Sequence, residues 1–199
     1  QRVQQLMLMN ARLPALLIID MQKCMASDEA GRRNNPAAQD NIARLLQAWR
    51  ARQGPVVHVR HMSRSATSLF APGQPGAEFQ ELFVPRPDEH VVEKNVPDAF
   101  INTGLERWLR VRDISQLVIV GVSTNISVEC SARTAGNLGF ATTVVSDATF
   151  AFAKADYSAV LRSAEEVHAM SLANLAGEYA KVEDSDTVLA RLALAGPGG

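Results

Sequence analysis

Short apolar runs alternate with segments of helical periodicity along almost the entire 199-residue chain. The first run, residues 15–19, contains no polar residue and ends at Asp20, which is typical of a strand buried on both faces in a parallel sheet. Pro36 then opens a segment with apolar residues at helical spacing, and Gly54-Pro55 ends it. The chain is therefore expected to begin with a strand, a helix and a second strand.

The same alternation continues to the C-terminal region. Further strands are predicted at residues 56–59, 91–94, 117–120, 141–145 and 179–182. Further helices are predicted at residues 101–111, in the segment that Gly136 and Gly139 close, and at residues 157–175 and 187–194. Because strands and helices alternate, the sequence predicts a three-layer α/β/α sandwich with a mostly parallel six-stranded sheet.

One long segment interrupts this alternation. Residues 62–90 contain four prolines, two glycines and three phenylalanines, which is too long and too punctuated for a simple connection. We expect this segment to form a lid or an interface arm. The remaining pattern indicates a single domain over residues 13–195, with residues 1–12 as a native extension or an expression remnant.

The composition argues against several classes of protein. Hydrophobic residues make up 47% of the chain and charged residues 21%, enough for one sizeable core. The formal net charge of -1 provides no positive excess to attract nucleic acid or anionic lipid. The apolar runs are far shorter than the roughly 20 residues of a membrane span, and no leader pattern opens the chain. We therefore expect a cytoplasmic protein without nucleic-acid or membrane partners.

Three chemically useful residues each follow a predicted strand. Asp20 follows the first strand, Lys94 ends the third, and Ser127 follows the fourth at the start of a helix. The reactive crevice of an open parallel sheet lies beyond the carboxyl ends of its strands, so these residues are expected near one another. A carboxylate that accepts a proton, an ammonium that keeps it ionised and a hydroxyl nucleophile form a set for acyl transfer. Free N–H groups at the helix start would hold an oxyanion.

Each of these residues also has a purely structural interpretation. An Asp after a strand commonly caps a turn, a Lys is commonly a solvated charge, and a Ser in a first helical turn is commonly an N-cap. Position alone favours these structural roles for Asp20, Lys94 and Ser127. The motifs around them favour the functional ones.

Three motifs carry a family resemblance. They are LIIDMQ at residues 17–22, VEKN at residues 92–95, and GVSTN at residues 121–125 followed by VE at 128–129 and AR at 132–133. Together they resemble the isochorismatase-like cysteine hydrolases, which include nicotinamidases, N-carbamoylsarcosine amidases and ureidoacrylate amidohydrolases. The resemblance covers residues 15–187. It implies the fold predicted above, a hydrolase of a small amide, ureide or carbamoyl compound, and a homodimer or homotetramer.

The resemblance also implies a role for each member of a catalytic triad. Asp20 would be the general base, Lys94 the cation, and position 127 the nucleophile. It further implies a cis peptide bond at Val122–Ser123, with the N–H groups of Ser123 and Ser127 forming the oxyanion hole.

Ser127 stands where most members of this family carry Cys. A hydroxyl needs a well-placed base throughout attack, whereas a thiol is activated by a modest pKa shift. Three explanations stay open: an introduced Cys-to-Ser change, a natural serine variant with altered chemistry, and a homologue that binds a ligand without hydrolysing it. Isochorismatases manage without the thiol, so a vinyl-ether hydrolase is a further alternative.

The two cysteines of the chain, Cys24 and Cys130, are too few for a disulfide scaffold and lack zinc-ligand spacing. Cys130 lies three residues after Ser127, but a small buried core thiol is the favoured interpretation. Cys24 is expected to be a loop residue.

The segment at the end of the second strand bears on metal binding, because nicotinamidases carry metal-ligating residues there. Here His58 and His61 point to opposite faces of the strand end and no carboxylate accompanies them, so we predict no catalytic metal and no cofactor. His58 is expected in the core. Substrate contacts are predicted from apolar and polar side chains around the crevice. These residues are Gln22, Arg60, His61, Phe70, Asn95 and Phe100.

Overall fold

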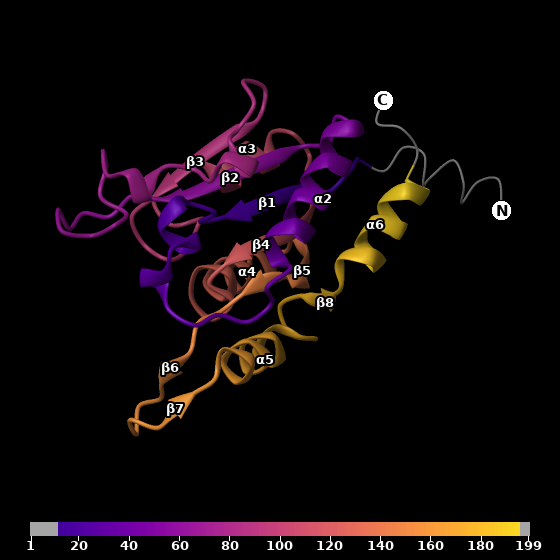
Figure 1. The fold of residues 1–199 in the computed structure, drawn as a ribbon. Helices are drawn as coiled ribbons and strands as arrows, with labels where there is room; N and C mark the ends of the chain where they lie inside the picture. The colour runs from indigo at the N-terminus through magenta and orange to yellow at the C-terminus, as the bar shows by residue number, and fades with distance from the viewer. Residues whose placement is uncertain (1–11, 196–199) are drawn as a thin grey trace.

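A six-stranded sheet forms the middle layer of the molecule, in the strand order β3-β2-β1-β4-β5-β8 (Figure 1). The computed structural model describes residues 12–195. The strands are β1 (Ala15–Ile19), β2 (Val56–His61), β3 (His90–Lys94), β4 (Gln116–Val122), β5 (Ala141–Phe150) and β8 (Lys181–Glu183). Every neighbouring pair in this sheet is parallel. The predicted fold class is therefore confirmed.

In the part of the chain that the structure describes, five α-helices cover the two faces of the sheet: α2 (Ala38–Ala51), α3 (Leu105–Arg110), α4 (Glu129–Asn137), α5 (Ala164–Leu175) and α6 (Ser185–Leu194). Alternate residues of β1 divide the core between the faces. Leu16 and Ile18 pack in a cluster with buried residues of α2 and α6, whereas Leu17 and Ile19 pack with α3, α4 and the end of α5. β1 is thus buried on both faces, as its unbroken apolar run predicts.

The segment that follows β2 packs against the loop that follows β1. Its short helices are η3 (Pro75–Ala77) and η4 (Glu81–Phe83), and the loop after β1 contains η1 (Lys23–Ala26) and η2 (Asp28–Ala30). Lys23 N donates to Glu78 O at 2.8 Å, and Gln80 N donates to Met21 O at 3.0 Å. Residues 77–80 are therefore fixed beside the carboxyl end of β1.

The predicted helix over residues 157–175 is wrong in its first half. Residues before Ser163 form a small hairpin, β6 (Lys154–Ala155) and β7 (Leu161–Arg162), and α5 begins at Ala164. The Asp156 carboxylate closes the hairpin turn by accepting from Ser158 N and Val160 N and by pairing with Arg162. Ser163 then starts α5 with a reciprocal capping box, its side chain accepting from Glu166 N.

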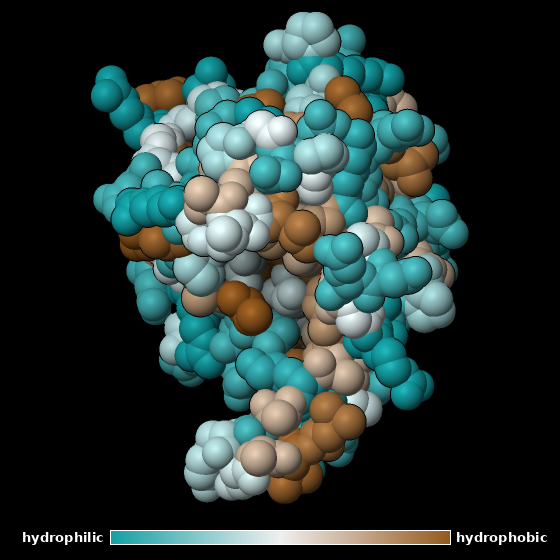
Figure 2. Space-filling model, turned by 60° about the vertical axis from the view of Figure 1, so that its left-hand side comes forward, coloured by the Kyte–Doolittle hydropathy of each residue, from teal (hydrophilic) through white to brown (hydrophobic). Residues whose placement is uncertain are grey.

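This hairpin projects from the body of the protein (Figure 1). The exposed side chains of Tyr157, Val160 and Leu161 lie on it. Figure 2 shows hydrophobic surface on the projection at the lower end of the molecule. Helical spacing of apolar residues was therefore misleading here, because those side chains do not pack on the sheet.

Other boundaries differ by smaller amounts. The helix predicted at residues 101–111 is shorter, Leu105–Arg110, and β5 runs to Phe150 rather than ending at residue 145. β5 continues because its pairing with β4 shifts register after Ile119 and then resumes. β8 and α6 begin two residues away from the predicted starts. Over residues 12–195 no helix has the length and apolar composition needed to cross a membrane.

Gly121 lets β4 approach β1 closely, which gives a stability prediction. Gly121 has φ +121°, and a Cβ there would lie 2.1 Å from the Ile19 carbonyl oxygen. Gly177 also has positive φ, +85°, but a Cβ there would meet nothing within 4 Å. We expect Gly177→Ala to cost about 1–2 kcal/mol of unfolding free energy, from backbone strain alone. Gly121→Ala should cost at least about 2 kcal/mol more, because a backbone atom must move.

Denaturant unfolding of the two variants measures this difference. Equal losses of unfolding free energy would show that the approach of β4 to β1 is not tight.

Candidate active site

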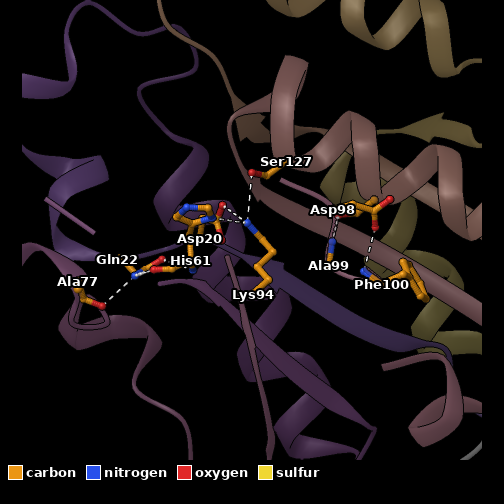
Figure 3. Close-up of polar contacts among 10 residues, drawn as sticks. Asp20, Gln22, His61, Ala77, Lys94, Asp98, Ala99, Phe100 and Ser127 are labelled. Carbon is orange, nitrogen blue, oxygen red and sulfur yellow. Dashed lines mark hydrogen bonds and ion pairs between the residues drawn. The ribbon is translucent and has the colours of Figure 1, made fainter. Parts of the chain in front are cut away.

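Asp20, Lys94 and Ser127 meet at the carboxyl edge of the sheet, as Figure 3 shows. Lys94 Nζ donates to Asp20 Oδ2 at 2.9 Å and to Ser127 Oγ at 3.4 Å. All three residues are buried. Asp20 directly follows β1 with φ +54°, a left-handed conformation that Asp adopts more readily than most residues. The structure thus brings together the three residues that the sequence singles out.

The Lys94 ammonium has a third acceptor in His61, the last residue of β2. The distance from Lys94 Nζ to His61 Nδ1 is 3.3 Å. An ammonium has three N–H donors and no acceptor, so His61 must accept through Nδ1 as a neutral imidazole. Burial, followed by the Lys94 charge, lowers the pKa of His61 and so favours this neutral form. Each N–H of Lys94 therefore has one acceptor within reach.

Burial controls the protonation of the Asp20 carboxyl. Desolvation raises its pKa above the ordinary 3.8, although Lys94 and the Ser127 hydroxyl act in the opposite direction. Asp20 Oδ2 accepts from Lys94, whereas Oδ1 is buried without a hydrogen-bond partner among the described residues. A buried carboxylate oxygen with free accepting capacity is suited to taking a proton.

Ser127 lies in a wide helical turn, η5 (Thr124–Val128), between β4 and α4. The expected cis peptide bond at Val122–Ser123 is present. Val128 N donates to Ser123 O at 3.2 Å, a bond that spans five residues instead of the four of an α-helix. The role of Ser123 and Ser127 as oxyanion donors stays a prediction.

Gln22 occupies a supporting position rather than an open one. Its Nε2 donates to His61 O and to Ala77 O, each at 2.8 Å, and its Oε1 accepts from His61 N at 2.8 Å (Figure 3). Both donors of the amide are thereby used, and the side chain is fully buried. Gln22 fixes the backbone of His61 against the segment that follows β2.

The other predicted substrate contacts divide into two groups. Phe70 meets the His61 ring edge-on, with centroids 5.2 Å apart, so it adjoins the triad. Phe100 is buried in the core and stacks on Phe140 with ring centroids 6.0 Å apart, so it packs in the fold instead of lining the site. Arg60 pairs with Glu93, and Asn95 accepts from Arg64 at 3.0 Å. Within residues 12–195, His61 contacts the triad through Lys94 and Phe70 adjoins it through His61, whereas the contacts of Phe100, Arg60 and Asn95 lie elsewhere.

Neither cysteine has the surroundings of an activated thiol. Cys24 is buried, and desolvation raises its pKa to about 11. Burial also raises the pKa of Cys130, with Asp98 and Glu129 acting in the same direction. His58 is fully buried and lies 2.7 Å from Glu89, which confirms its expected place in the core. No group of three His, Cys, Asp or Glu side chains suited to a metal occurs in residues 12–195.

Sequence reasoning missed two residues of α5 that touch the segment carrying Ser127. His168 contacts the Thr124 hydroxyl, and Ser171 contacts the Thr124 carbonyl. The available signal was a pair of polar residues three positions apart, which places both on one face of a helix. The apolar periodicity of neighbouring positions concealed it.

The burial of the ion pair generates a test that needs no substrate. Lys94→Met should lower the unfolding free energy by about 3–5 kcal/mol at neutral pH, because Asp20 keeps a buried charge without its cation. Lys23→Met is the matched control, because Lys23 pairs with Glu78 on an exposed surface, where solvent screens the pair, and its loss should change the unfolding free energy little.

The loss should also depend on pH in a defined direction. A carboxyl whose pKa is raised on folding stabilises the folded state below its unfolded pKa, and this contribution is lost as pH rises through the folded pKa. Without Lys94 the pKa of Asp20 rises further, so the cost of Lys94→Met should shrink as pH falls from neutral towards 3.8. A cost independent of pH in denaturant unfolding would contradict this account.

Comparison with known proteins places this geometry in a family. The isochorismatase domain model matches residues 14–186. The isochorismatase family protein YrdC of Bacillus subtilis is 37% identical over 175 residues, covering 88% of this chain and 94% of YrdC. Nicotinamidase 3 of Arabidopsis thaliana is 31% identical over 191 residues, covering 89% of this chain and 87% of that protein.

A crystal structure from Chromobacterium violaceum, described as an isochorismatase-family hydrolase, has a TM-score of 0.89 and 49% identity. The match covers 92% of this chain and 97% of that one. The buried Asp20, Lys94 and Ser127 thus lie in a chain that belongs to the isochorismatase family of hydrolases.

Proposed function

We propose that this protein hydrolyses the C–N bond of a small amide, ureide or carbamoyl compound, with Ser127 as the nucleophile. The observation that carries the proposal is the buried Lys94 ammonium, which donates to both Asp20 and Ser127. Membership of a hydrolase family and similarity to a nicotinamidase support the reaction class. The active protein is expected to be a homodimer or homotetramer.

In the first half of the reaction, Asp20 accepts the Ser127 hydroxyl proton while Oγ attacks the substrate carbonyl carbon. The resulting oxyanion receives hydrogen bonds from the backbone N–H groups of Ser123 and Ser127. The carbonyl reforms as the C–N bond breaks, and Asp20 returns the proton to the leaving nitrogen. An acyl ester on Ser127 and a free amine or ammonia result.

Water completes the cycle. The water oxygen attacks the ester carbon while Asp20 takes a proton from the water. Asp20 then passes this proton to Ser127 Oγ when the C–O bond breaks. The product is a carboxylic or carbamic acid, and Ser127 regains its hydroxyl. Throughout, the neighbouring Lys94 ammonium favours the ionised form of Asp20.

The raised pKa of Asp20 compensates in part for the use of serine. A carboxylate with a higher pKa is a stronger base, and a hydroxyl requires more help from its base than a thiol does. Lys94 also donates to the Ser127 oxygen, which stabilises negative charge as the proton leaves.

The same raised pKa supports a second candidate. A protonated Asp20 is an acid that protonates the vinyl carbon of an enol ether, the first step of vinyl-ether hydrolysis, which needs no nucleophilic thiol. A homologue that only binds a ligand is the third outcome that the following experiment distinguishes.

Hydrolysis should require both Asp20 and an attacking side chain at position 127. With a panel of nicotinamide, N-carbamoyl amino acids, ureides and enol ethers, we expect release of ammonia or amine from one of the C–N substrates. Asp20→Asn and Ser127→Ala should each lower kcat by about 10²–10⁴-fold. Ser127→Cys should retain turnover, because the thiol is the more easily ionised nucleophile.

Cys130→Ser is the matched control and should leave turnover unchanged, since its thiol has a raised pKa and the triad does not use it. Cleavage confined to enol ethers, unaffected by Ser127→Ala, would favour the second candidate. Tight binding without product from either wild type or Ser127→Cys would favour a binding protein and end the amidase proposal.

The rate should rise with pH through the pKa of Asp20. The proposed base must be ionised, and burial raises its pKa, so the acid limb of kcat/KM should have its midpoint above 3.8. The pKa of His61 is lowered from 6.5, so protonation of His61 should affect the profile only below that value. A limb centred below 3.8, or one that survives in Asp20→Asn, would contradict Asp20 as the base.

A further inference from the structure

Helix α5 holds the turn that carries Ser127, although α5 contributes no residue to the triad. Thr124, the first residue of that turn, is fully buried against α5. Its hydroxyl and its carbonyl each contact a different α5 side chain, and both side chains are buried. Such double attachment of one residue fixes both the position and the rotation of the chain at that point.

The first attachment is a hydrogen bond to His168. Thr124 Oγ1 and His168 Nδ1 are 2.7 Å apart, and His168 Nε2 lies 3.0 Å from Ser146 O. A carbonyl only accepts, so Nε2 carries the hydrogen and Nδ1 accepts from the Thr124 hydroxyl. Desolvation lowers the pKa of His168, which agrees with this neutral form. His168 thereby links the turn to the backbone of β5.

The second attachment is Ser171, three residues further along the same helical face. Its Oγ lies 3.0 Å from Thr124 O and 2.8 Å from Glu129 Oε1, so its single hydrogen is shared between the two acceptors. Thr124 begins the wide turn and Glu129 begins α4 immediately after it. Ser171 therefore touches both ends of the segment that contains Ser127.

These attachments matter because the turn has an unusual width. The Val128 N–H reaches Ser123 O, and the Glu129 N–H reaches Thr124 O, five residues back in each case. An isolated helix start would relax towards the more favourable four-residue spacing. That relaxation would rotate Ser127, whose oxygen is already 3.4 Å from Lys94 Nζ, near the limit for a hydrogen bond.

We propose that His168 and Ser171 are positioning residues, which hold the turn Thr124–Val128 at the width that directs position 127 towards Lys94. This inference deepens the proposed function, because it assigns to α5 the placement of the nucleophile. The alternative is that the two side chains only satisfy buried polar groups and stabilise the fold.

A thiol placed at position 127 reports its contact with Lys94 without any substrate. In the Ser127→Cys protein, the alkylation rate of that thiol by iodoacetamide is followed against pH, and peptide mass analysis separates it from Cys24 and Cys130. The midpoint gives the thiol pKa. Adding Lys94→Met to Ser127→Cys calibrates the shift that complete loss of the lysine contact produces.

We expect Thr124→Val, His168→Phe and Ser171→Ala, each added to Ser127→Cys, to shift the midpoint in the same direction as Lys94→Met and by a substantial part of its size. Thr124→Ser keeps the hydroxyl and should restore the parental midpoint. Thr142→Val is the matched control, because it removes a comparable buried hydroxyl bond, to Phe140 O, outside this turn, and should leave the midpoint unchanged.

Thr124→Val and His168→Phe should also be non-additive, since each removes the same hydrogen bond. Parental midpoints in folded Thr124→Val and Ser171→Ala proteins, with only the unfolding free energy reduced, would overturn the inference. If His168→Phe does not fold, Thr124→Val tests the same hydrogen bond and Ser171→Ala tests the second attachment. Shifted midpoints in a protein that hydrolyses none of the panel would leave the positioning role intact and remove only the proposed reaction.

Discussion

The buried ammonium of Lys94 is the constraint around which the rest of the site is arranged. Removing a charged amine from water costs several kcal/mol unless each N–H finds an acceptor and the charge finds a partner. Asp20 supplies the charge, and His61 and Ser127 supply the remaining acceptors. The same neighbours also lower the pKa of the proposed base, against the larger effect of burial, and the Lys94 contact helps to place the proposed nucleophile.

Sheet topology brings these four residues together. β1 lies between β2 and β4, and β3 lies beyond β2, so the ends of four parallel strands deliver all four residues to one edge. Gly121 lets β4 lie close against β1 just before the turn that carries Ser127. Two groups outside the sheet then hold the site by hydrogen bonds. Gln22 binds the backbone of His61, and α5 binds Thr124.

The fold class and the meeting of Asp20, Lys94 and Ser127 could be predicted, because each of these residues stands at the carboxyl end of a predicted parallel strand. An unbroken apolar run followed by Asp20 specifies a buried parallel strand and its polar end within a few residues. The roles of His168 and Ser171 could not be predicted, because they depend on which helix face meets a turn more than 40 positions earlier in the chain. The hairpin at residues 154–162 was missed for a related reason: the Asp156 turn and the Ser163 cap outweigh an apolar spacing that also fits a helix.

The bonds of Gln22 have a consequence for the segment that follows β2. Gln22 and its neighbours form hydrogen bonds that hold residues 77–80 against the loop after β1. The Gln22 side-chain amide also binds the backbone of His61, the last residue of β2. Residues 63–76 lie between these two fixed points. A change of loop length between them would leave the backbone at His61 and at Ala77 held by the same amide, and the four buried groups with it.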